Sequence, residues 1–200
     1  THGMRRKGSK PFGAFLLRVG DKDRFHLALS TTELSHAAKG FERWMAPSVA
    51  LEIGVDAGQN FAAALKMVGR ELDTLNRRGG FLREVAARFP SLHGKREVAF
   101  GPLLPVGVAV RDSAADDEYS AGAILTLVLT SNVHACHFRF DAQRLPREAA
   151  IGLAERFATF LESIAAKPTA ALSQLDILPA AESKRVLVEW NQTAREYPKN

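Results

Sequence analysis

His134, Cys136 and His137 are the residues whose types come nearest to a metal site. Structural zinc takes four nitrogen or sulfur ligands in a tetrahedron. The surrounding residues predict a strand, on which His134 and Cys136 share one face while His137 points to the other. A fourth ligand at suitable spacing is also missing. The pattern favours structural histidines over a metal, and the alternation of Cys136 with Phe138 and Phe140 predicts a small core residue.

The other residues that could do chemistry give weak signals. Asp116, Asp117 and Glu118 could act as paired carboxylates, but consecutive acids in a polar loop are typical of a solvated turn. The glycines at positions 54, 79 and 80 lack the spacing of a phosphate-binding loop. No helix N-terminus adjoins Cys136 to activate its thiol. We therefore predict no catalytic residue and no bound metal, nucleotide or cofactor in this chain.

The composition is that of a folded globular chain. It has 200 residues, 46% of them hydrophobic, and a mean hydropathy of −0.11, which allows a substantial core. Apolar runs such as 124–129 fall short of the roughly 20 residues that cross a bilayer. The single cysteine excludes an internal disulfide framework and fits a reducing compartment. We expect a cytoplasmic protein with no membrane partner.

Part of the +5 net charge lies in a basic N-terminal segment, residues 1–10. Because no aromatic residues interleave its charges, we predict a solvated tail and no nucleic-acid partner. The chain begins at Thr1 rather than Met, which suggests an excised or a processed chain from which part of the active unit is missing.

The periodicity of apolar residues alternates between the helical and the strand period, which predicts an α/β fold. Predicted helices cover 11–19, 60–78, 81–89, 146–168 and 180–189, and predicted strands cover 24–30 (half-buried), 48–55 and a pair at 124–140 that meets at Ser131 and Asn132. The stretch 31–47 is expected to be irregular or partly helical, and 112–122 an acidic loop. Pro102 and Pro105 predict an edge strand or a bend within 98–110.

Two of these helices carry apolar stripes that should face the core. The first stripe comprises Phe61, Ala64, Leu65, Val68, Leu72 and Leu75. The second comprises Ile151, Ala154, Phe157, Ala158, Leu161 and Ile164.

The last thirty residues carry the most specific pattern in the chain. Residues 172–182 read Leu-Ser-Gln-Leu-Asp-Ile-Leu-Pro-Ala-Ala-Glu, and 190–198 read Trp-Asn-Gln-Thr-Ala-Arg-Glu-Tyr-Pro. This segment closely resembles the connector between the condensation and adenylation domains of nonribosomal peptide synthetases, which ends in a pattern close to Trp-Asn-x-Thr-x-x-x-Tyr-Pro. The order of the upstream elements resembles the C-terminal subdomain of the condensation domain.

The resemblance implies a chloramphenicol acetyltransferase-like half-domain, with a mixed sheet flanked by helices. It divides the chain into the basic tail (1–10), the condensation lobe (11–168) and the linker toward an adenylation domain (169–200). It also implies three partners: the missing N-terminal lobe, the adenylation domain, and acidic carrier proteins that bring phosphopantetheine. Carrier-binding candidates are Arg77, Arg78, Arg83 and Arg88, and linker docking residues are Val186, Leu187, Trp190, Tyr197 and Pro198.

The chain departs from the family inside the lobe. The usual Gly-x-Phe-Val-Asn string is absent around 45–48, and 76–81 keeps only the phenylalanine of His-Gln-Asp-x-Pro-Phe. The catalytic signature His-His-x-x-x-Asp-Gly, which the family carries in its N-terminal subdomain, is absent from these residues. Two hypotheses follow: one lobe of an amide-forming condensation domain, inactive alone, or a degenerate lobe that supports an adjacent adenylation domain.

Overall fold

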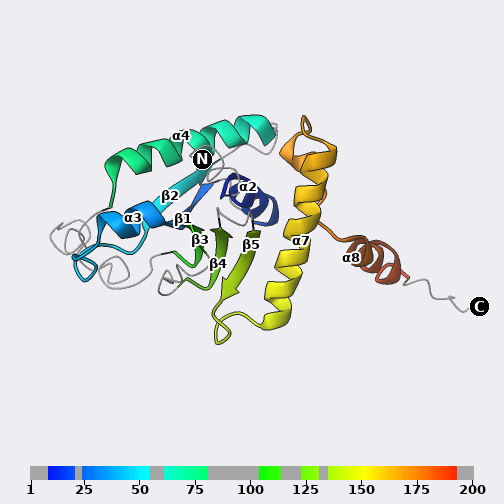
Figure 1. Cartoon of the computed structure of the whole chain (residues 1–200). Helices are drawn as coiled ribbons and strands as arrows, with labels where there is room; N and C mark the ends of the chain where they lie inside the picture. The colour runs from blue at the N-terminus through cyan, green and yellow to red at the C-terminus, as the bar shows by residue number, and fades with distance from the viewer. Residues whose placement is uncertain are drawn as a thin grey trace, which may run out of the picture.

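The computed structural model describes residues 9–20, 24–54, 61–80, 104–113, 123–130 and 135–192. Its centre is a five-stranded mixed sheet in the order β2-β1-β3-β4-β5 (Figure 1). The strands are β1 (Arg24–Thr31), β2 (Val49–Gly54), β3 (Val106–Arg111), β4 (Leu125–Thr130) and β5 (Ala135–Phe140). β1, β3 and β4 are parallel, while β2 and β5 run antiparallel at the two edges.

The helices of the described part are α2 (Ser9–Val19), α3 (Thr32–Ala37), α4 (Phe61–Arg78), α7 (Arg147–Ala166) and α8 (Ala180–Lys184). A short 3-10 turn, η2 (Leu172–Gln174), follows α7, and a π-helical turn, η3 (Arg185–Glu189), continues α8. The α/β expectation and the flanked mixed sheet are confirmed. None of the helices in the described part is long and apolar enough to span a membrane.

One face of the sheet carries the core. Alternate residues such as Leu27, Leu51, Val108 and Leu127 point to the same side and are at most 1% exposed. On them lie α2, α4 and α7, which contribute a cluster of aromatic rings: Phe12, Phe15, Phe61, Phe157 and Phe160. Burial of these apolar side chains is the main driving force for this arrangement.

Local sequence explains where several elements begin and end. Thr31 caps α3, because its hydroxyl oxygen accepts a hydrogen bond from the Leu34 N–H at 3.2 Å. Gly79 ends α4 in a left-handed conformation (φ +70°) that favours glycine. In α2, a Cβ at Gly13 would lie 3.1 Å from Ile53 Cδ1, so the glycine lets the helix pack closely on β2.

The strand predictions need two corrections. The interpretation of 98–110 as an edge strand is wrong, because β3 lies inside the sheet between β1 and β4. The alternative of a bend is confirmed at Pro105, which directly precedes β3 and whose carbonyl accepts hydrogen bonds from Ile124 and Leu125. β1 is half-buried only at its start, since its last five residues are buried on both faces of an interior strand.

The stripe predicted for 146–168 is also partly wrong. Phe157 is buried as predicted, but Ile151 is 47% exposed, and the unpredicted Phe160 is fully buried. The cause is the aromatic cluster: Phe160 packs against the rings of Phe15 and Phe61, with centroids 5.8 and 6.5 Å away. Tertiary contacts therefore rotate the buried face of α7 away from Ile151.

Candidate functional site

The described part of the chain holds no cluster of three metal-ligating side chains. Its perturbed carboxyls belong to surface contacts rather than to a cleft. Hydrogen bonding to Lys167 lowers the pKa of Asp176, and hydrogen bonding to Arg156 lowers the pKa of Glu182. These carboxylates are held ionised by their partners, which is the opposite of what a general acid requires.

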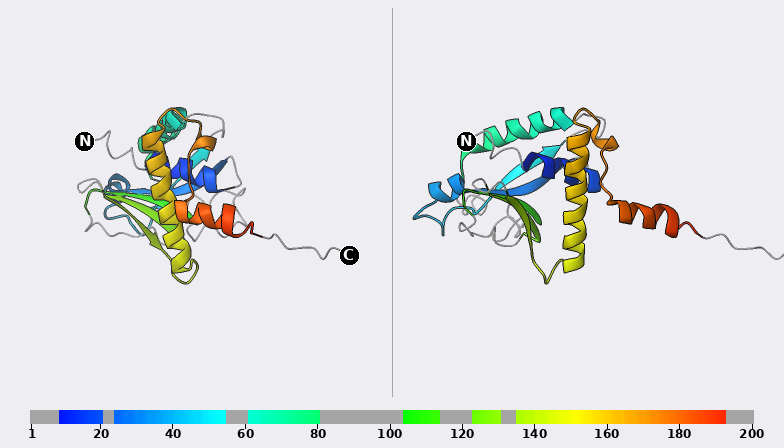
Figure 2. Two further views of the ribbon diagram at one scale, coloured as in Figure 1. Left: turned by 90° about the vertical axis from the view of Figure 1, so that its right-hand side faces the viewer. Right: turned by 45° about the vertical axis from the view of Figure 1, so that its right-hand side comes forward.

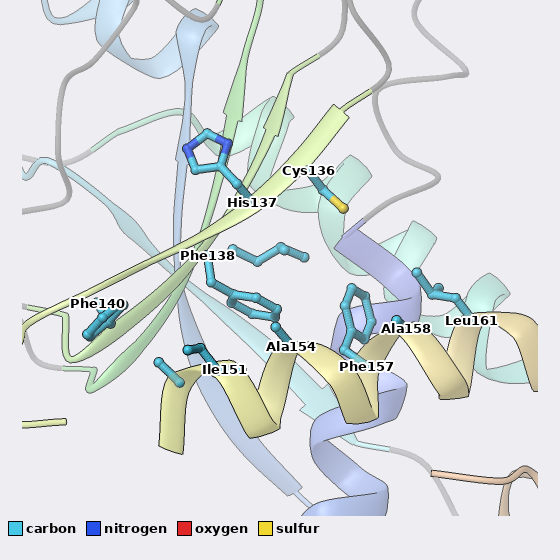
Figure 3. Close-up of a pocket in the computed structure, with 11 residues that line it drawn as sticks. Cys136, His137, Phe138, Phe140, Ile151, Ala154, Phe157, Ala158 and Leu161 are labelled. Carbon is cyan, nitrogen blue, oxygen red and sulfur yellow. The ribbon is translucent and has the colours of Figure 1, made fainter. Parts of the chain in front are cut away.

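Cys136 and His137 lie on opposite faces of β5, as the strand period predicts, and Figure 3 shows their side chains pointing apart. His134 and the acidic residues 116–118 lie outside the described residues. The expectation that Cys136 is a core residue is wrong, because its side chain is exposed. β5 is an edge strand, and its first three residues are exposed.

An apolar groove of about 330 Å³ lies between β5 and α7 (Figure 3). Phe138 and Phe140 form its strand side, and Ile151, Ala154 and Ala158 form its helix side. Because two of these helix residues are alanines, α7 does not fill the space beside the strand. Most of the stripe predicted as core thus lines this groove.

A buried polar network ties together the carboxyl ends of β1 and β3. Arg111, only 4% exposed, donates to Ser30 Oγ at 2.9 Å. The Asp112 N–H donates to Thr32 Oγ1 at 3.1 Å. Sequence reasoning missed this network. The sequence offers one signal, which is that Arg111 directly follows the apolar run 106–110. A charged residue in this place resembles an ordinary strand end.

The predicted carrier-binding arginines are only partly placed. Arg77 and Arg78 occupy the last turn of α4, where both are exposed and where cations also complement the helix dipole. Arg83 and Arg88 lie outside the described residues. The structure therefore puts two of the four candidates on an accessible surface, and their carrier binding stays a prediction.

The linker exposes the side chains that we predicted to dock. Leu187 and Trp190 are 65% and 66% exposed, and Val186 is half-buried. α8 and η3 form the helix predicted at 180–189, and Figure 2 shows them leading away from the sheet. Tyr197 and Pro198 lie outside the described residues.

The linker is nevertheless tied to the lobe at its beginning. Leu172 and Leu175 are 1% exposed and belong to the core, so residues that follow α7 complete the packing of the lobe. Arg156 of α7 then holds Glu182 of α8 through paired hydrogen bonds, the Nε–Oε2 distance being 2.9 Å. The start of α8 is thus fixed, while Leu187 of η3 and the following Trp190 stay exposed.

Comparison with known proteins first finds short sequence matches. Linear gramicidin synthase subunits B and C of Brevibacillus parabrevis are 39% and 35% identical to this chain over 56 and 60 residues. These matches cover 28% and 30% of this chain and 1% of each synthase. No known family profile matches the sequence.

Similar solved structures cover nearly the whole chain. The starter condensation domain of rhizomide synthetase RzmA gives a TM-score of 0.62 at 16% identity, over 89% of this chain and 45% of that one. The first condensation domain of the CDA synthetase gives 0.56 at 18% identity, over 88% and 42%. This chain has the condensation-domain fold. The predicted resemblance is thereby confirmed at the level of the fold.

The match with these solved structures is partial on their side. The chain spans less than half of the two condensation domains just described. It also matches holo-AB3403, a four-domain nonribosomal peptide synthetase bound to AMP and glycine, with a TM-score of 0.64 at 15% identity, over 90% of this chain and 16% of that one.

Proposed function

We propose that this chain is the C-terminal lobe of a nonribosomal peptide synthetase condensation domain and contributes to amide-bond formation between carrier-tethered donor and acceptor substrates. The observation that carries the proposal is the condensation fold, shared over 88% to 90% of the chain. The connector pattern at 172–198 also supports it, because that pattern resembles the connector of the same class of synthetase.

In the reaction, the amine of the acceptor attacks the thioester carbonyl of the donor. A C–N bond forms, the C–S bond breaks, the donor thiol leaves, and the attacking nitrogen loses a proton. On this proposal, the phosphopantetheine that carries each substrate is attached to the partner carrier protein, and this chain does not bind a cofactor directly. We assign the lobe a positioning role, since bringing two tethered reactants together supplies a large part of such a rate enhancement.

The test uses the complete polypeptide that contains these 200 residues. Two loaded carriers are added, and the amide product is measured by mass spectrometry. We expect product that depends on residues 11–168, and a His-His-x-x-x-Asp-Gly string in the preceding lobe. A full-length protein that folds and binds both carriers but forms no amide would reject the catalytic role.

The second candidate is a degenerate lobe that supports an adenylation domain. The observation that favours it is the exposure of Leu187 and Val188 of η3 and of Trp190, which a neighbouring domain would cover. In this case the same assay yields no amide, while deleting residues 169–200 weakens the attachment of the adenylation domain. Limited proteolysis of the full polypeptide measures that attachment.

A further inference from the structure

The apolar groove between β5 and α7 has a fixed floor and a short helix wall. Leu127 is fully buried and Phe157 is only 4% exposed, so the groove reaches down to the core. The ring of Phe138 packs edge-on against Phe157, with centroids 5.9 Å apart, which fixes the strand side. On the helix side, Ala154 and the exposed Ala158 are too short to fill the space. Apolar surface of this kind favours an apolar ligand that displaces its water.

The two ends of the groove lie far apart. Figure 3 shows Phe140 and Ile151 at one end and Cys136 and Leu161 at the other. From Cys136 to Phe140 the strand advances by about 13 Å. From Ile151 to Leu161 the helix advances by about 15 Å. Because a C–C bond of about 1.5 Å carries an extended alkyl chain forward by about 1.3 Å, the groove is long enough for about ten carbons in a line.

A positive charge stands at the Ile151 end of the groove. Arg147, which is exposed, precedes Ile151 by four residues and therefore lies one turn earlier on the same side of α7. It is the first residue of α7, where the helix dipole favours an anion and where Pro146 supplies no side-chain cap. In the preceding turn, the exposed Arg144 and the half-buried Asp141 contribute one charge of each sign. An anionic head group is therefore favoured beside Arg147.

The carboxylates of α7 lie to one side of the groove. Arg147 is only about 20° round the helix from Ala154, the middle of the helix wall, whereas Glu148 is about 120° away. Glu155 and Glu162 stand at about 100° and about 80° from Ala154 and follow toward the far end of the groove. A carboxylate ligand would be repelled at that end and attracted at the Arg147 end.

We propose that this groove binds one medium-chain fatty carboxylate, with its alkyl chain along Phe138 and its carboxylate beside Arg147. The terminal methyl group then lies near Cys136. Arg139 points to the opposite face of β5 and takes no part. A linear ligand fits better than a protein surface, because an apolar groove of about 13 Å with a cation at one end matches one chain and one head group. The proposal concerns binding alone and does not rest on the condensation role.

Cys136 makes the test direct, because it is the single cysteine of the chain, it is exposed, and it lines the groove. The 200-residue chain is treated with the neutral reagent iodoacetamide while decanoate is added below its micelle concentration. Mass spectrometry gives the rate of Cys136 alkylation, which decanoate should slow in a saturable way. From hexanoate to decanoate, each added methylene should tighten binding about fourfold, and methylenes that extend beyond the groove should add little.

Substitutions in α7 test the two halves of the ligand. Ala154→Leu fills the groove and should abolish the protection of Cys136. Ala149→Leu, at an exposed position about 140° round the helix from Ala154, is the matched control and should keep it. Arg147→Gln should weaken decanoate binding about two- to fivefold and leave decanol binding unchanged, because decanol carries no charge. Circular dichroism checks that each variant keeps its fold.

Several results would overturn the proposal. Unchanged Cys136 alkylation in decanoate, or equal protection in Ala154→Leu and Ala149→Leu, would mean that the alkyl chain does not lie in the groove. Protection that grows with protein concentration in the absence of decanoate would assign the groove to a second copy of this chain. Protection by phosphatidylglycerol vesicles but not by decanoate monomers would assign it to a membrane surface. The condensation role stands or falls separately, on the amide-forming assay.

Discussion

At the scale of single residues, Phe160 shows most clearly how the core of this lobe is specified. Its ring is fully buried among Phe15, Phe61 and the rest of the aromatic cluster. The apolar stripe read from the sequence instead included Ile151, which is nearly half exposed. The two side chains are both large and apolar, so only their surroundings distinguish them.

We predict that Phe160→Ala lowers the free energy of unfolding by about 3–5 kcal/mol, because it leaves a cavity in a packed aromatic cluster. Ile151→Ala, on the same helix, should lower it by less than about 1 kcal/mol, because that side chain already contacts water. Urea unfolding followed by circular dichroism measures both. Equal losses in the two variants would contradict the assignment of the buried face.

The Arg156–Glu182 pair predicts a dependence on pH. Arg156 lowers the pKa of Glu182 in the folded protein, so the contact is fully present above the unfolded value of about 4.3 and is lost as the pH falls through the lower folded value. In Trp44→Phe, which leaves Trp190 as the only tryptophan of the chain, the fluorescence anisotropy of Trp190 should therefore fall on acidification below about pH 4.3.

Glu182→Gln provides the control for this titration. Its Trp190 anisotropy should already be low at pH 7 and should show no further step in acid. An acid step of the same size in Glu182→Gln would mean that other carboxyls, rather than Glu182, hold α8 in place.

At the scale of elements, the linker combines a fixed beginning with an open surface. Leu172 and Leu175 complete the core, and Arg156 holds Glu182, whereas Leu187 and Trp190 face water. An apolar face that is presented on a tethered helix is suited to docking on a neighbouring domain. This arrangement supports the linker role that the connector pattern predicts.

We predict that Leu187→Asp weakens the contact between the linker and an adenylation domain at least tenfold, because it puts a charge into an apolar interface. Lys184→Asp, on the preceding turn and exposed, is the matched control and should have a much smaller effect. Binding of the isolated adenylation domain to each variant, measured by calorimetry, gives the comparison. A normal affinity for Leu187→Asp would exclude this face from the interface.

At the scale of the whole molecule, the positive charge of the chain fits the acidic carrier that we propose as a partner. The chain carries a net charge of +5, and Arg77 and Arg78 stand at the end opposite the linker. Long-range attraction to an acidic carrier acts mainly on association and is screened by salt. On the proposed function, the two ends of the lobe serve different partners, a carrier at one end and an adenylation domain at the other.

We predict that Arg77→Glu with Arg78→Glu weakens carrier binding and flattens its dependence on salt, because two favourable charges become repulsive. Arg147→Glu is the control, since this exposed arginine lies at the start of α7, away from the end of α4. The test measures carrier affinity at salt concentrations from about 50 to about 500 mM, a range over which salt increasingly screens the attraction between exposed charges. Unchanged affinity in the double variant would remove these arginines from the carrier surface.

The sequence by itself predicted most of the helices and strands and their order, because the helix and strand periods are local properties. It left 31–47 open between irregular structure and a partial helix, where the structure has α3. It also indicated the fold, because the connector pattern at 172–198 resembles that of the family residue by residue. Which face of α7 is buried, the interior place of β3 and the exposure of Cys136 were decided only by the tertiary structure.

The physical reason is that the burial of a side chain depends on contacts with residues that are distant in the sequence. Phe160 is covered by rings from α2 and α4, and β3 acquires neighbours on both sides that lie far away in sequence. Periodicity identifies an apolar face, whereas packing decides which side chains water can still reach.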